Sequence, residues 1–420
     1  MTNLWVIGGG IESIPGLQVA KKMGLTVILS DANGEAPGIS LADYFFKADT
    51  YSANETINCM NQFISKSNKI HGVIALAADV PETLASTSTY LGLVGQSIET
   101  SVNVSNKYLM KQVLRKAGVL VPNFWKIETI DSLVDNLREG KKYVLKPVDS
   151  RGARGVLLID SDTDFKWAFE ESIKHSPSGC LILEEYLDGP QISTESLVQN
   201  GSLYHVGFAD RNYDKLEQFQ PHIIEDGGSQ PSMLSPKIRK SIFEMAGKAG
   251  SALGLETGVL KGDMVWHQEK PFVIEVATRL SGGWFSSVQI PSSTKISFVE
   301  LAIRQSLGEN ISTFFEKRVK YMPVASRYVF VESGTLLPEP SEVALPKSGS
   351  IVFTKLLYDK PMISENITKH NQRIGVVIAK GLTRKRAIKN ANKQVGRLKS
   401  QLLKNCKNGQ SAILKDKRIE

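Results

Sequence analysis

The first hundred residues alternate short apolar runs with helical patterns, and no other feature of the sequence restricts the fold as strongly. Strands that alternate with helices predict a parallel sheet, because parallel neighbours need a long crossover connection. We therefore expect an α/β domain over residues 1–102. Its expected strands cover 4–7, 26–29 and 72–76, and its expected helices end near Gly24 and span 83–91.

A glycine cluster follows the first expected strand, at Gly8-Gly9-Gly10, and Asp31 comes about twenty residues later. A glycine-rich turn followed by a distant acid is typical of dinucleotide-binding folds. The spacing is imperfect here, since the next glycine is Gly16. A tight strand-to-helix turn that needs small residues explains the cluster better than an NAD or FAD site does.

The composition is that of a soluble globular protein with more than one domain. The chain has 420 residues, 41% hydrophobic and 22% charged, and this length predicts two or three domains. No run approaches the roughly 18 uncharged apolar residues of a membrane span, and the N-terminus enters a strand pattern without the features of a signal peptide. Cys59, Cys180 and Cys406 lack metal-binding spacing and indicate a reducing compartment, so we expect a cytoplasmic protein.

Positive charge is concentrated near the C-terminus. The net charge is +8, and residues 380–417 are dense in lysine and arginine. Such a segment is either a nucleic-acid-binding patch or the solvated face of a helix. It has no aromatic residues for base stacking. We therefore favour a solvated helix from about Thr383 to Leu403 and expect no nucleic-acid partner.

The middle of the chain mixes strand and helix patterns. Residues 105–114 read as a helix that Ser105 or Asn106 caps and Gly118 ends. A strand-helix-strand-helix-strand pattern then indicates a small lid-like α+β unit, and several strands with one helix at 237–253 follow it. The expected domains are 1–102, 103–316 with its lid at about 124–187, and 317–420.

Two segments carry groups suited to phosphate and base binding. Lys146 ends an apolar strand, where an unpaired ammonium is costly, so it should face an anion. The glycine-bearing loop 150–155 offers backbone N–H groups and arginines to the same kind of ligand; an ordinary basic hairpin is the alternative. Glu184 and Glu185 end the next apolar strand, where a carboxylate could accept hydrogen bonds from an adenine amino group or ribose hydroxyls.

A third segment carries acids on neighbouring strands. Glu275 and Arg279 are four residues apart and should share one strand face with Ala277. Asp263 lies on the preceding strand pattern. Two carboxylates on paired strands can hold Mg²⁺, and the arginine can then bind a phosphate or carboxylate. The alternative is a plain ion pair between Glu275 and Arg279.

In this order, the segments resemble the ATP-grasp superfamily. The matching pieces are a helix with Lys107, the strand YVLKP with its glycine loop, the hinge LEEYLDG, and the pair GD and IEVATRLSGG. The C-terminal segment 373–381 and the helix after it are similar to the closing domain of biotin carboxylase. The resemblance implies a parallel α/β domain, a small lid, a central antiparallel ATP-binding sheet and a C-terminal α+β domain.

The resemblance also implies a role for particular residues. Asp263 and Glu275 would bind Mg²⁺ or Mn²⁺, Arg279 and Lys146 would be catalytic, and Glu195 would lie near the ribose. From their places in the chain, substrate contacts are expected from Arg211, Ser281, Gly282, Gly283 and Arg373. The ATP-binding residues implied are Lys107, Lys146, Ser150, Arg151, Gly152, Arg154, Gly155, Glu184, Glu185, Leu187 and Glu195.

The sequence departs from the family at Ala277, where many members have an asparagine as a third metal ligand. We expect an ATP-dependent ligase that joins small-molecule carboxylate and amine substrates through an acylphosphate, and a homodimer is a common assembly. Two alternatives stay open. One is a carboxylase or purine-pathway ligase that uses bicarbonate or formate, and the other is a non-catalytic ATP-binding protein.

Overall fold

The computed structural model describes residues 1–315 and 321–416, with side chains described as far as Leu403. The expected domain boundary at Lys317 and the side chains of Lys404, Lys407 and Lys415 lie outside this part. The chain divides into two compact units, each made of three stretches. This division does not test the three consecutive domains expected above. Unit 1 comprises Met1–Phe124, Leu187–Phe208 and Met233–Lys320, and unit 2 comprises Trp125–Tyr186, Ala209–Ser232 and Tyr321–Glu420.

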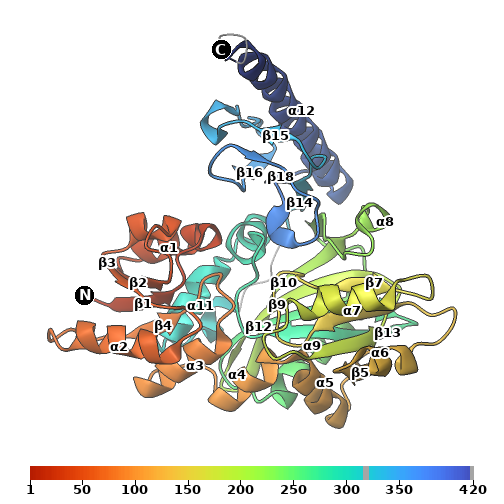
Figure 1. The fold of residues 1–420 in the computed structure, drawn as a ribbon. Coiled ribbons are helices and arrows are strands. Elements are labelled where there is room, and N and C mark those ends of the chain that lie inside the picture. The colour runs from red at the N-terminus through yellow and green to blue at the C-terminus, as the bar shows by residue number, and fades with distance from the viewer. Residues whose placement is uncertain (316–320, 417–420) are drawn as a thin grey trace. The chain divides into compact units, whose positions relative to one another are not determined.

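Unit 1 begins with the expected parallel sheet, in the order β3-β2-β1-β4. Alternate residues of β1 point to opposite faces, and Trp5 and Ile7 pack in one core with Met60 and Phe63 of α2. Helices α1 and α2 cover opposite faces of this sheet (Figure 1). The elements are β1 Asn3–Ile7, α1 Ile14–Lys22, β2 Thr26–Asp31, β3 Tyr44–Lys47, α2 Ala53–Ile64, β4 Gly72–Ile74, α3 Pro81–Tyr90 and α4 Ile98–Ser105.

The second part of unit 1 is antiparallel. Strand β12 pairs with β13 on one side and with β9 on the other. The aliphatic side of these strands packs against α5 and α9 through residues such as Met110, Ile242 and Met264. The opposite face is left for polar side chains. The elements are α5 Lys107–Lys116, β9 Gln191–Gln199, α9 Pro236–Ala252, β12 Gly258–His267, β13 Lys270–Ala277, α10 Ile290–Thr294 and α11 Phe298–Ser306.

Unit 2 contains a small α+β part in the region expected to form the lid, with a four-stranded sheet in the order β5-β8-β6-β7. Its core includes Tyr143, Leu145, Leu181 and Leu183, with α6 and α7 packed together beside it. Strand β7 is one strand more than the sequence pattern predicts. The elements are β5 Phe124–Ile127, α6 Ile130–Asn136, β6 Tyr143–Pro147, β7 Leu157–Ile159, α7 Phe165–Ile173 and β8 Leu181–Glu185.

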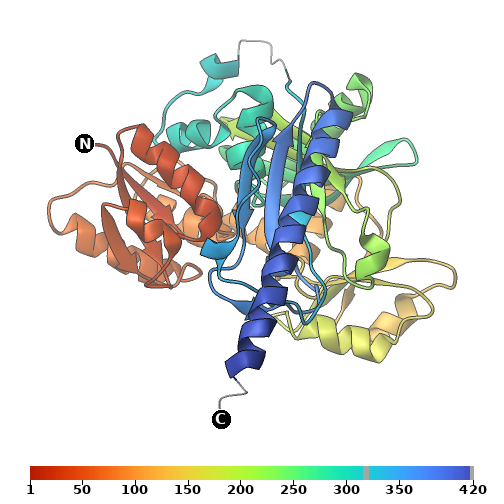
Figure 2. The ribbon, with the colours of Figure 1, turned by 90° about the horizontal axis from the view of Figure 1, so that it is seen from above.

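The rest of unit 2 is an antiparallel sheet in which β14 pairs with β11 and β18, and β18 pairs with β16. Helix α12 lies along β14 and β18 (Figure 2) and packs alanines and leucines onto them. Strand β10, Ser202–Asn212, begins in unit 1, and its last residues, which belong to unit 2, pair with β11. The other elements are α8 Leu216–Phe219, β11 Gly227–Gln230, β14 Val324–Val329, β15 Leu336–Leu337, β16 Ile351–Leu356, β17 Met362–Ile363, β18 Gly375–Lys380 and α12 Arg384–Asp416.

The helix ends show which local predictions were right. Asn106, not Ser105, caps α5, since its side chain accepts hydrogen bonds from the N–H groups of Tyr108 and Leu109. Ser105 instead ends α4, a helix that the pattern did not indicate. Thr383 caps α12 through the N–H of Arg386. Within the described residues, no helix is both long and apolar enough to cross a bilayer.

Candidate functional site

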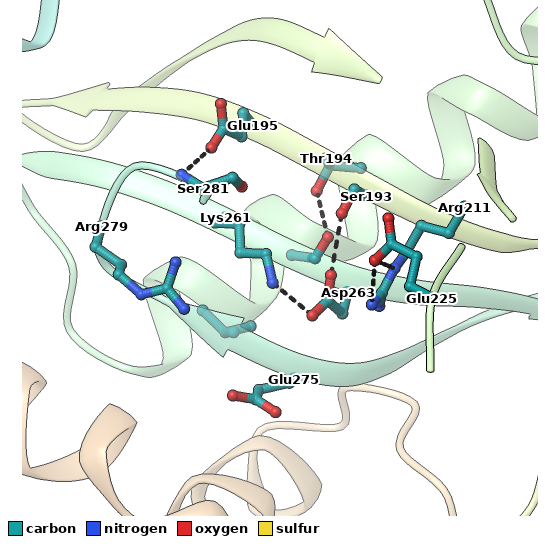
Figure 3. Close-up of polar contacts among 12 residues, drawn as sticks. Ser193, Thr194, Glu195, Arg211, Glu225, Lys261, Asp263, Glu275, Arg279 and Ser281 are labelled. Carbon is teal, nitrogen blue, oxygen red and sulfur yellow. Dashed lines mark hydrogen bonds and ion pairs between the residues drawn. The ribbon is translucent and has the colours of Figure 1, made fainter. Parts of the chain in front are cut away.

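Two carboxylates lie directly opposite each other on β12 and β13. Asp263 pairs in register with Glu275, and Lys261 pairs with Ala277. Directly opposed residues share a sheet face with their Cβ atoms about 5 Å apart. The four side chains therefore form one patch, and Figure 3 shows Asp263 and Glu275 on neighbouring strands with Lys261 reaching Asp263. This confirms the expectation that the two acids come from paired strands.

Both oxygens of Asp263 have partners within unit 1. Oδ1 accepts a hydrogen bond of 3.1 Å from Ser193 Oγ, and Oδ2 forms a short ion pair with Lys261 Nζ. The Asp263 side chain is 12% exposed. Lys261 was not singled out from the sequence. Only the i, i+2 spacing from Asp263 could have indicated it.

The donor set fits a single Mg²⁺. Mg²⁺ takes one or two protein carboxylates and completes its shell with water and substrate phosphates, and Asp263 and Glu275 supply that pair. Ala277, next on the same face, adds no donor atom. In the part of the chain that the structure describes, no group of three or more His, Cys, Asp or Glu side chains gathers as a metal site.

Helix α5 brings two lysines to β13. Lys107 Nζ lies 3.7 Å from Glu275 Oε1, as an ion pair with 11% and 32% of the two side chains exposed. One turn later, the fully buried Lys111 donates to the carbonyl of Val273 at 3.0 Å. Residues i and i+4 share a helix face, so both lysines can reach β13. They contact it differently, because Lys107 pairs with a side chain and Lys111 bonds a backbone carbonyl. Lys111 was missed because its partner is 162 residues away.

Arg279 lies beyond the end of β13, so the expectation that it shares the strand face of Glu275 is wrong: the strand stops at Ala277. Its Nε pairs with Asp79 Oδ2 at 3.0 Å, not with Glu275. Burial disfavours its charge, but the carboxylates of Asp79, Glu275 and Asp263 outweigh burial and raise the pKa of Arg279. The guanidinium is therefore held in a field of three acids, two of which are the expected metal ligands.

Glu195, which the resemblance places near the ribose, contacts other residues of unit 1 in this structure. Its side chain is fully buried, and its carboxylate accepts hydrogen bonds from the N–H of Ser281 at 2.5 Å and from Ser286 Oγ at 2.6 and 2.8 Å. Burial raises the pKa of Glu195, and these hydrogen bonds act against that rise. Glu195 therefore anchors the loop that follows Arg279 (Figure 3).

The same loop is held from its other side by Glu12. The N–H of Gly283 donates to Glu12 Oε2 at 2.9 Å. A Cβ on Gly282 would lie 2.5 Å from that oxygen, so only glycine fits there without a shift. Gly283 has φ +63° and Trp284 φ +58°, the left-handed conformation. Neither Glu12 nor Asp79 was predicted.

In unit 2, Lys146 and Glu184 form a buried ion pair. Their side chains are 5% and 3% exposed, and Nζ lies 2.9 Å from Oε1. The anion that Lys146 was expected to face is thus Glu184 in this structure. Glu185 pairs with the more exposed Lys141 at 3.0 Å. Leu187 is buried at the start of the next stretch of unit 1.

The expected phosphate loop 150–155 is a tight turn. Gly152 and Gly155 have φ near +66° and +69°, and Arg154 Nε donates to the carbonyl of Arg151. No neighbouring atom lies within 4 Å of a Cβ built on Gly152. Its carbonyl accepts a 3.3 Å hydrogen bond from the N–H of His370. Ser150 is buried.

The two expected substrate arginines of unit 2 meet at one residue. Arg211 donates through Nε and Nη2 to Glu225 Oε2 at 3.1 and 2.9 Å, and Arg373 Nη2 donates to the Glu225 carbonyl at 2.6 Å. Arg373 also stacks over the Tyr328 ring at 3.7 Å. A third arginine, Arg327, was missed. It is buried on β14, and burial lowers its pKa.

Comparison with known proteins gives a family match over the central residues of the chain and structural matches over nearly all of it. Residues 104–283 match the family model described as an ATP-grasp domain. The chain is 23% identical over 248 residues to the D-alanine–D-alanine ligase of Coprothermobacter proteolyticus, covering 55% of this chain and 73% of that protein. It is 25% identical over 294 residues to the alanine–anticapsin ligase of Bacillus subtilis, covering 63% of this chain and only 60% of that protein.

Among solved structures, the L-amino acid ligase of Bacillus licheniformis superimposes with a TM-score of 0.77. The match covers 96% of this chain and 98% of that one at 20% identity. This likeness establishes the fold, including the parts outside residues 104–283. The expected fold class, a multidomain α/β and α+β architecture, is confirmed.

Proposed function

The chain carries an ATP-grasp domain and has ligases among its relatives, and from this premise we propose that it is an ATP-dependent ligase that joins a carboxylate substrate to an amine. The observation that carries the proposal is the pair Asp263 and Glu275, opposed on β12 and β13. Lys107 and Arg279 supply positive charge to the same patch. The four groups suit a bound metal–triphosphate, which needs positioning and charge neutralisation more than a protein nucleophile.

The proposed reaction has two steps. A carboxylate oxygen of the first substrate attacks the γ-phosphorus of ATP, and the bond to the bridging oxygen of ADP breaks. The amine nitrogen of the second substrate then attacks the acyl carbon, phosphate leaves, and the amine loses a proton. When bound, Mg²⁺ on Asp263 and Glu275 would neutralise phosphate charge. Arg279, held by Asp79, would orient the transferred phosphoryl group or the substrate carboxylate.

In unit 2, we propose that Lys146 binds an ATP phosphate and that the turn 150–155 covers the phosphates with its N–H groups. Glu184 and Glu185 end the strand expected to meet the adenine. The ion pair of Lys146 with Glu184 supports this role, because it holds the ammonium in one place at the end of β6.

The substrate class we propose is an amino acid for at least one of the two partners. The support is the names of the similar proteins, which refer to D-alanine, alanine and L-amino acids.

The test is ADP release from ATP in the presence of a panel of amino acids, singly and in pairs. At least one acid–amine pair should stimulate release, and Glu275→Ala should lower kcat/KM by about 100-fold or more. Glu244→Ala, a change of an exposed acid on α9, serves as the matched control and should have no effect. The proposal fails if ATP binds while no pair stimulates its hydrolysis and Glu275→Ala changes nothing. Bicarbonate-dependent turnover without an amine acceptor would favour the carboxylase alternative.

A further inference from the structure

We propose that Lys261 replaces a second divalent cation, so that the chain binds one metal ion per nucleotide and uses this ammonium as a fixed positive charge beside it. The inference rests on the proposed function, because it concerns the metal–nucleotide complex. It concerns a positioning residue, since Lys261 acts through Asp263.

The sheet register places Lys261 at the centre of the patch. Across β9, β12 and β13, one row of opposed residues is Ser193, Asp263 and Glu275. The next row on the same face is Glu195, Lys261 and Ala277. Opposed residues share a face and lie about 5 Å apart. Lys261 therefore has a carboxylate-bearing residue beside it on its own strand and another across from it.

The contacts show which of these two acids forms an ion pair with Lys261. Lys261 Nζ pairs with Asp263 Oδ2. Glu195 is already occupied by Ser281 and Ser286. Only 14% of the Lys261 side chain is exposed, so the pair is largely shielded from solvent. A charge in such a position acts more strongly than one in bulk water.

The residue opposite Lys261 explains why a cationic side chain fits in the patch. Ala277 stands directly opposite Lys261 and has no oxygen to offer a metal. With one metal held by Asp263 and Glu275, a second metal would find no third His, Cys, Asp or Glu side chain gathered with them in the described part of the chain. It would also be repelled by the ammonium that pairs with Asp263.

The charges of the patch agree with this assignment. Two carboxylates, Asp263 and Glu275, are accompanied by the cations Lys261, Lys107 and Arg279. The positive charge that a second metal would bring is thus already supplied in part by the side chains. Lys261, opposite Ala277, would supply the charge that in many family members comes from a metal ion bound by an asparagine at the position of Ala277.

The test is the ratio of Mn²⁺ to AMP-PNP retained by the full-length protein after equilibrium dialysis, with free Mn²⁺ read by electron paramagnetic resonance. We expect one Mn²⁺ per bound AMP-PNP in the unmodified chain and in Lys261→Arg, which keeps the charge. The double variant Lys261→Ala with Ala277→Asn should retain two. Lys240→Ala, which removes an exposed lysine of α9, should stay at one.

Each outcome decides the matter. Two Mn²⁺ per nucleotide in the unmodified chain would overturn the inference and leave the proposed function standing. A ratio of one in a folded double variant would also overturn it, with folding checked by circular dichroism. If that variant does not fold, the ratio in the unmodified chain still decides. If AMP-PNP is not retained at all, the proposed function fails and the inference fails with it.

Discussion

At the scale of single residues, the buried acid Glu195 gives a pH-dependent prediction. Its pKa is raised by burial, so the folded state keeps a proton that the unfolded chain releases above about pH 4.3. The free energy of unfolding of the unmodified chain, relative to Glu195→Gln, should therefore fall as pH rises from about 4.3 to the raised pKa, and level off above it. Urea unfolding between pH 4 and pH 8 measures this. Glu244→Gln, on an exposed face, should show no such trend, and a flat difference for Glu195→Gln would contradict the prediction.

The ion pair of Lys146 with Glu184 gives a second prediction at this scale. Lys146→Met leaves a buried carboxylate without its ammonium partner and should lower the free energy of unfolding by about 3–5 kcal/mol. The double variant Lys146→Met with Glu184→Gln should recover part of this loss, because both charges are gone. Lys141→Met, which removes the exposed partner of Glu185, should leave the urea midpoint nearly unchanged. Equal effects of the two lysine changes would show that the burial of the pair is not what matters.

At the scale of an element, helix α5 is aligned on β13 by Lys107 and Lys111. Lys111→Ala removes a charge-assisted hydrogen bond to Val273 and should cost about 2 kcal/mol of unfolding free energy. It should also weaken AMP-PNP binding severalfold, because Lys107 reaches the patch from the same helix. Calorimetric titration of AMP-PNP checks the second effect. Lys116→Ala, an exposed lysine of the same helix, is the control and should change neither quantity.

Some helices and strands could be predicted from the sequence and others could not. The strands β1, β2, β12 and β13 were predictable, because apolar runs and flanking glycines are local signals. Helix α4 was missed, since its residues IETSVNVS include β-branched and polar side chains without a clear helical stripe. The pairing of Asp263 with Glu275 was also predictable, because two short strands in succession tend to pair.

The partners of the site residues were not predictable in the same way. Asp79 is 200 residues from Arg279 in the chain, and no local pattern links them. The contacts of Glu195 with Ser281 and Ser286 were not predicted either, because an acid in a strand looks the same whether it faces a ligand or anchors a buried loop. Lys261 was not predicted either. The role proposed for it as a fixed positive charge depends on its pairing with Ala277, and the sequence alone does not fix that register.

At the scale of the whole molecule, ligand binding should be visible as stability. A ligand that binds only the folded chain, at 100 times its Kd, adds about 2.7 kcal/mol to the free energy of unfolding. AMP-PNP with Mg²⁺ should therefore raise the melting temperature of the full chain, and EDTA should remove much of that rise. Glu275→Ala should melt normally alone but gain little from Mg²⁺. A rise that is the same with and without metal would contradict the assignment of Asp263 and Glu275.

The loop after Arg279 has a consequence for protein engineering. Asp79 holds Arg279, and Glu12 holds Gly283, so the segments that follow β4 and β1 supply two of the supports of that loop. Residues 1–102 are therefore not interchangeable with the same region of a relative. Grafting the N-terminal sheet of a relative onto residues 103–420 would succeed only if the donor brought carboxylates to both places. Without them, the hybrid protein would fold, but the orientation of the Arg279 side chain would no longer be fixed by an ion pair.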